Sequence, residues 1–156
     1  MKNRFISSLA LTISIVSSTV MADTATEVRQ VVLEQIAHMN QELNQDPMRL
    51  SKDGSKEFFS SGGLLTYLDR TSGGNTFEMF QGSIKLIEVV VLVEGQAAVV
   101  HFYQEAMMQP TGLNAAPNYR TRVAQAFVKE EGGWKIRAAH YSPLMGGEST
   151  SQTVIK

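Results

Sequence analysis

Apolar side chains recur at helical spacing near the start of the chain and at a spacing of two later on. From Val28 to Leu43 they fall three or four residues apart, which predicts an amphipathic helix. Thr24-Ala25-Thr26-Glu27 has the spacing of a capping box, so the helix is expected to begin at Thr24 and to end before Asp46-Pro47. A second, weaker helical piece, interrupted by Lys52-Asp53-Gly54-Ser55, is expected from about Pro47 to Phe59.

After the break at Ser60 to Gly63 the pattern changes to strands separated by turns. One or two helices followed by antiparallel strands predict an α+β domain, in which a strongly bent sheet wraps over the helices and leaves a cavity. Apolar residues in both phases of several strands indicate that the second face is covered, as by another subunit. The expected strands are Leu64 to Asp69, Phe77 to Phe80, Ser83 to Glu94, Gln96 to Met108, Tyr119 to Lys129 and Trp134 to Tyr141, with a long loop from Gln109 to Asn118.

The first 22 residues have the pattern of a secretory signal. Lys2 and Arg4 precede an apolar stretch from Phe5 to Val20, and Val20-Met21-Ala22 places small residues at a cleavage site. We therefore expect a signal at 1–22, a domain at 23–145, a flexible tail at 146–156 and a periplasmic or secreted protein. Because no later apolar segment is long enough to span a bilayer, no stable membrane insertion is expected after cleavage.

Composition narrows the classes of function. The formal charge of −1 is lowered further by loss of the signal, which argues against a general nucleic-acid binder. The 3 histidines are far apart and there is no cysteine, so no metal site is expected. No phosphate-cradling glycine loop or nucleophile motif occurs, and no cofactor is expected.

The segment from Tyr119 to Ser142 resembles the closing hairpin of SnoaL-like members of the nuclear transport factor 2-like superfamily. It contains a strand with an inward polar residue, a charged turn ending in Gly133-Trp134, and a last strand ending in His140-Tyr141-Ser142. The break after Phe59 and the loop after Met108 resemble those of exported, uncharacterised members. The resemblance implies a cone-shaped sheet with helices inside its curve, a homodimer through the outer face, and a pocket without a fixed reaction.

Arg122 and His140 are the first candidate site residues. A guanidinium within a strand needs a carboxylate, a ligand anion or water, so Arg122 is either an anion clamp, an ion-pair partner of Glu105 or Glu78, or a solvated residue. His140 is in phase with Trp134, and it faces the cavity if Trp134 does. There it would serve as an acid, a base or a hydrogen-bond donor.

His101 and Tyr103 share one phase of their strand, and Phe102 and Gln104 share the other. Either phase is able to face inward. If His101 and Tyr103 do so, they join the candidate arginine and histidine in a polar cluster within an apolar pocket; otherwise they lie on the outer surface. Trp134 is expected as an apolar wall or core residue.

Three functions are compatible with these residues. The first is an exported protein that binds a partly apolar small molecule, with Arg122 and His140 as the polar end of the site. The second is an acid-base enzyme of the same fold, of isomerase, cyclase or dehydratase type, with His140 as general base. The third is a protein-interaction module that uses the outer face of the sheet.

Overall fold

The computed structural model describes residues 23–144. The expected signal at 1–22 and the expected tail at 146–156 lie outside these residues. One helix, α1 (Thr24–Glu42), is followed by a short 3-10 helix, η1 (Pro47–Arg49), and by strands. The strands are β1 (Ser55–Phe58), β2 (Thr66–Leu68), β3 (Phe77–Val93), β4 (Ala97–Pro110), β5 (Ala116–Glu130) and β6 (Gly133–Pro143).

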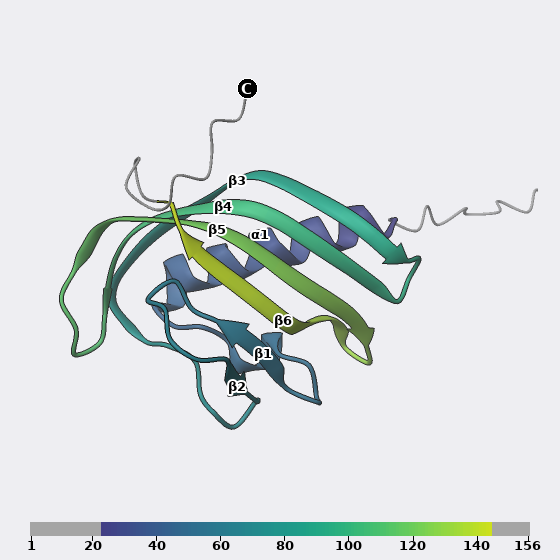
Figure 1. The fold of residues 1–156 in the computed structure, drawn as a ribbon, viewed down its shortest axis with the longest axis horizontal. Helices are drawn as coiled ribbons and strands as arrows, with labels where there is room; N and C mark the ends of the chain where they lie inside the picture. The colour runs from purple at the N-terminus through teal and green to yellow at the C-terminus, as the bar shows by residue number, and fades with distance from the viewer. Residues whose placement is uncertain (1–22, 145–156) are drawn as a thin grey trace, which may run out of the picture.

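The six strands form one curled sheet in the order β2-β1-β6-β5-β4-β3. The long strands β3 to β6 arch over α1, and the short strands β1 and β2 extend the sheet beside β6 (Figure 1). This arrangement confirms the α+β class and the strongly bent sheet wrapped over an N-terminal helix. The sheet is mixed rather than wholly antiparallel, because β1 pairs with β6 in parallel.

The expected second helix from Pro47 to Phe59 is wrong. Only η1 is helical there, and Gly54, at φ 74°, turns the chain into β1. Pairing with β2 on one side and β6 on the other supplies the backbone hydrogen bonds that a helix would have supplied locally. Tertiary pairing has therefore overridden a weak helical pattern.

The start of α1 also differs from the expected capping box. Asp23 is the N-cap, and its carboxylate accepts a hydrogen bond from the Thr26 amide at 2.7 Å. Thr24 instead donates its hydroxyl to Glu94 at 2.6 Å, which ties the helix to the β3–β4 turn. Glu27 does not reach back to the cap; its Oε2 accepts a hydrogen bond from the Trp134 indole at 2.6 Å.

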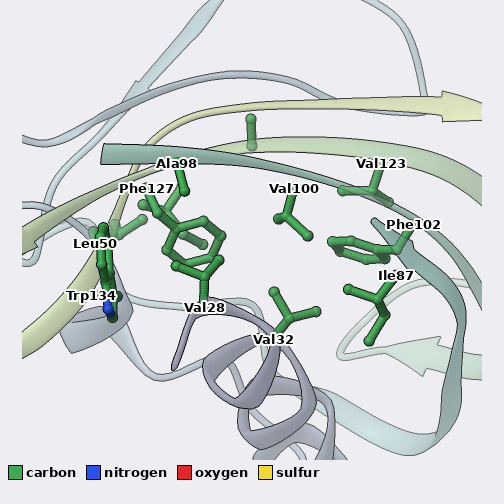
Figure 2. Close-up of a cluster of buried hydrophobic side chains, with 12 residues drawn as sticks. Val28, Val32, Leu50, Ile87, Ala98, Val100, Phe102, Val123, Phe127 and Trp134 are labelled. Atoms are coloured by element: carbon green, nitrogen blue, oxygen red, sulfur yellow. The ribbon is translucent and has the colours of Figure 1, made fainter. Parts of the chain in front are cut away.

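The core lies between α1 and the inner face of the sheet. Val28 and Val32 on the helix point toward Val100 and Phe102 on β4 and toward Phe127 on β5 (Figure 2). All five side chains are buried, which is the expected consequence of an apolar stripe meeting one phase of the strands. The helical stripe that the sequence indicates is thus the surface that holds α1 against the sheet.

A β-bulge interrupts β6. Phe127 on β5 pairs with Ile136, whereas the preceding Ala126 pairs with Ala138, so Arg137 is one residue more than β5 can match. The extra residue shifts the alternation of side chains by one position. Trp134 and Ile136 face inward before the bulge, and Ala139 is the next buried residue after it.

Candidate functional site

The curl of the sheet leaves a cavity of about 490 Å³ beside the core, which is in the usual size range for small-molecule sites. Its walls come from α1, from the segment around η1, from the inner face of β4 to β6 and from Ile84 on β3. A neighbouring cavity of about 620 Å³ lies toward the β4–β5 loop. Residues that line both are Met39, Gln45, Gln104 and Tyr141.

Arg49 is held at the wall of the first cavity by the local fold of η1. The Asp46 carboxylate accepts a hydrogen bond from the Met48 amide at 2.8 Å and so caps η1. Directly after it, Ser51 donates its amide to the Ile136 carbonyl at 2.9 Å, which fixes the segment against β6. These contacts fix the backbone on both sides of Arg49, and its guanidinium donates a hydrogen bond from Nη2 to Gln45 Oε1 at 3.3 Å.

Glu57 on β1 faces Arg49 from the interior of the domain. Arg49 Nη1 lies 3.6 Å from Glu57 Oε1, and the two side chains are 9% and 0% exposed. This distance is an ion pair rather than a hydrogen bond, and neither Glu57 oxygen nor Arg49 Nε has a hydrogen-bond partner among residues 23–144. Buried polar atoms without partners are rare in folded proteins. They mark a place where water or a bound molecule completes the hydrogen bonds.

Gln125 and Tyr141 form a second polar pair in the same wall. Gln125 Nε2 donates a hydrogen bond to the Tyr141 hydroxyl oxygen at 3.1 Å, and Gln125 Oε1 is buried with no partner among the described residues. Burial raises the pKa of the Tyr141 hydroxyl to about 12. Tyr141 is therefore a neutral hydrogen-bond donor whose proton is available to a molecule in the cavity.

Trp134 fulfils the expectation of a wall or core residue. It is 4% exposed, lines the first cavity and donates its indole N–H to Glu27. The Lys129 ammonium lies 5.1 Å from the centre of the indole ring and also contacts Glu27. These contacts fix the ring at one end of the cavity.

The structure places the remaining candidates on the outer face of the sheet. Val100, Phe102 and Gln104 face inward, so His101 and Tyr103 are exposed. Arg122 pairs across the strands with Tyr103 and is exposed too. The carboxylate of Glu105 meets Lys85 and Arg120 instead of Arg122.

The inward position expected for His140 is also corrected, and the bulge is the reason. His140 is in phase with Trp134 in the sequence, but the extra residue at Arg137 turns it to the outside. There its Nε2 lies 3.2 Å from Ser142 Oγ, and its ring lies against Phe58. Ligand binding by the four outer-face candidates stays a prediction, but neither cavity is lined by them.

Sequence reasoning missed the polar residues that do line or adjoin the cavity: Arg49, Glu57, Gln125 and Tyr141. The sequence did not indicate an inward-facing Glu57, because the segment that contains it has a weak helical pattern. Gln125, however, carried a usable signal. It lies between Val123 and Phe127 in the apolar phase of its strand, and a polar residue at such a position needs an interior partner.

The first cavity is lined by both polar and apolar side chains. Among residues 23–144 no group of three histidines or carboxylates is arranged to hold a metal ion. No helix within these residues is long and apolar enough to cross a membrane. The wall offers one ion pair, one phenol and several amides, and Glu34, His38, Asp46 and Lys135 also line it beside the apolar side chains of α1 and the sheet.

Comparisons with known proteins agree on the fold. No family model and no curated protein matches the sequence. A nuclear transport factor 2-like superfamily protein from Salmonella enterica serovar Typhimurium superposes with a TM-score of 0.59 at 17% identity, covering 81% of this chain and 96% of that one. The chain thus has the nuclear transport factor 2-like fold, to which SnoaL-like proteins belong.

Two proteins from Novosphingobium aromaticivorans are similar in structure as well. One, named as an aromatic ring hydroxylase, has a TM-score of 0.61 at 15% identity, with 78% of this chain and 90% of that one covered. The other, a scytalone dehydratase-like protein, has a TM-score of 0.59 at 14% identity, with 77% and 83% covered. At such identities the likeness establishes the fold alone.

Proposed function

We propose that the protein binds a small, partly apolar molecule in the cavity between α1 and the sheet. The observation that carries this proposal is the cavity of about 490 Å³ that Arg49, Gln125 and Tyr141 line, in whose wall Gln125 Oε1 and Arg49 Nε are buried without hydrogen-bond partners among residues 23–144. A bound molecule with both a donor and an acceptor would complete their hydrogen bonds. The polar end of the site is thus assigned to Arg49, Gln125 and Tyr141 in place of Arg122 and His140.

Mass spectrometry of small molecules that copurify with the protein tests this assignment. Wild type is compared with Gln125→Leu, which removes the amide at nearly constant volume, and with Arg122→Ala on the outer face. We expect one compound class with wild type and Arg122→Ala, and its loss from Gln125→Leu. Retention by Gln125→Leu together with loss from Arg122→Ala would contradict the assignment and move the site to the outer face.

An acid-base enzyme of the same fold is the second candidate, and Glu57 is the observation that favours it. Glu57 is the one carboxylate that residues 23–144 bury completely, and it adjoins the cavity through Arg49. Such a carboxylate is a candidate acid or base. If the protein is an enzyme, Glu57→Gln is expected to abolish turnover of the copurified compound while binding is retained. If it is a binding protein, neither wild type nor Glu57→Gln converts the compound.

We further propose that the protein is exported and forms a homodimer. The signal pattern at residues 1–22 supports export to the periplasm or the medium, and sequencing of the mature N-terminus tests it, with Asp23 as the expected first residue. Exposed apolar side chains on β3, among them Leu86, Val90 and Leu92, support a covered surface. Light scattering with size-exclusion chromatography tests the dimer, and a monomer at micromolar concentration would contradict it.

A further inference from the structure

The two cavities are neighbouring chambers on the same inner face of the sheet. They share Met39 and Gln45 on one side and Gln104 and Tyr141 on the other. A molecule that reaches Tyr141 from the first chamber therefore lies at the entrance to the second. The combined site is elongated along the strands, because the lining of β4 passes from Phe102 in the first chamber to Met108 in the second.

The second chamber differs chemically from the first. Its inner end is formed by Phe77 and Phe80, whose ring centres are 4.9 Å apart, together with Met108. Two of its polar groups satisfy each other, since the hydroxyls of Ser60 and Tyr119 are 2.9 Å apart. Asn75, Asn118 and Arg120 also line it, and the buried Thr121 hydroxyl has no partner among residues 23–144. Apolar side chains of this kind stabilise a hydrocarbon body rather than a second polar group.

The polar end of the first chamber favours an uncharged head group. The charge of Arg49 is already opposed by Glu57, so an anionic ligand would have to compete with a carboxylate for the same guanidinium. The nearby phenol and amide are neutral, and the other charged residues that line the cavity, Glu34, Asp46 and Lys135, include both signs. Tyr141 has a proton to donate and Gln125 Oε1 accepts, so a group that both donates and accepts, such as a primary amide or an alcohol, fits them.

We propose that the ligand is an elongated, uncharged amphiphile whose polar head meets Gln125 and Tyr141 in the first chamber and whose apolar body extends past Gln104 into the second. This inference rests on the proposed function, because it names the class of molecule that the same site takes. The proposed function requires only the first chamber, whereas this inference also assigns a role to the second chamber.

Linear primary amides of four, six, eight and ten carbons are the probes, measured by calorimetry on the purified protein. In wild type the affinity is expected to rise about fourfold for each methylene that is buried, through the whole series. Ala116→Trp places an indole in the second chamber, which Ala116 lines. In this variant the shorter amides are expected to bind as tightly as they bind to wild type. The longer amides are expected to gain no further affinity.

Met108→Trp is a second way to fill the same chamber from β4, in case the first variant folds poorly. Gln125→Leu is expected to weaken every amide by the same factor, about tenfold, because it removes a contact of the head. Arg122→Ala is the matched control on the outer face, with no change. Octanamide is expected to bind more tightly than octanoate or octylamine.

The outcomes separate this inference from the proposed function. If wild-type affinity levels off at the same length as in Ala116→Trp and Met108→Trp, the second chamber is not used and the inference fails while the proposed function stands. Tighter binding of octanoate overturns the uncharged head. If no amide binds and no copurified compound depends on Gln125, both proposals fail.

Discussion

The two faces of the same strands differ in what they do with polar residues. On the inner face, Val123 and Phe127 are buried against the helix, and Gln125 between them has the Tyr141 hydroxyl as its one side-chain partner in the part of the chain that the structure describes. On the outer face Arg122 is exposed to water. A polar group costs little in water and much in the interior. The few polar residues in the inner phase are therefore more informative about function than the many in the outer phase.

The largest expected difference between the faces is in stability. Phe127→Ala removes a side chain that is 1% exposed, and it is expected to lower the free energy of unfolding by about 3–5 kcal/mol through lost burial and a cavity. Arg122→Ala is expected to change it by less than about 0.5 kcal/mol. Urea unfolding followed by circular dichroism measures both. A comparable loss in Arg122→Ala would show that this residue holds the fold together.

The next effect concerns the buried ion pair. Arg49→Met leaves the Glu57 carboxylate buried without its counter-charge and is expected to lower the free energy of unfolding by about 3 kcal/mol. The double variant Arg49→Met with Glu57→Leu is expected to regain most of that stability, because both charges are gone. The same unfolding experiment measures the cycle. Additive losses would mean that the two side chains do not interact.

A smaller effect is expected at high pH. The folded-state pKa of Tyr141 is raised to about 12 from an ordinary value of 10.0, so its neutral form contributes stability that is present below pH 10. That contribution is lost as the pH rises through the folded-state value. Absorbance titration of wild type and Tyr141→Phe measures it. The variant should lack the last phenolate step, and a wild type that finishes titrating near pH 10 contradicts the prediction.

The smallest effect is expected at low pH, at the start of α1. Hydrogen bonds from Lys129 and from the Trp134 indole lower the pKa of Glu27. A lowered pKa contributes stability above the unfolded-state value of 4.5, and this contribution is lost as the pH falls through the folded-state value. Unfolding of wild type and Glu27→Gln at pH 7 and pH 3 should show a smaller acid loss in the variant. Equal losses would contradict it.

The sequence predicted most of the fold because the signals were long and periodic. The stripe from Val28 to Leu43 and the long apolar strands define α1 and β3 to β6, and the Tyr119 to Ser142 pattern resembles proteins whose fold this chain has. The site was less predictable, because it depends on pairing between distant segments. Glu57 faces inward only because β1 pairs with β6, and no local pattern marks that parallel contact.

The sequence did not show which residues of β6 face inward, and the physical reason is different. Alternation along a strand identifies a face only while each residue has one partner, and at Arg137 two residues of β6 lie opposite one of β5. Because of this single extra residue, Tyr141 faces the cavity, whereas simple alternation predicts that His140 does. In β4 the register beside Phe102 is regular. There the sequence left undecided only which of the two sets of alternating residues faces inward.

The bulge at Arg137 also bears on how this protein can change over evolutionary time. Because the extra residue is accommodated within the strand, deletion of the Arg137 codon would restore regular pairing, with Ile136 and Ala138 becoming consecutive. Ile136 and Tyr141 would both keep their inward positions, although the hydrogen bond from the Arg137 guanidinium to the Gly54 carbonyl would be lost. Relatives whose last strand is one residue shorter can therefore have the same binding wall, and alignments across this point should be anchored on strand pairing rather than on residue count.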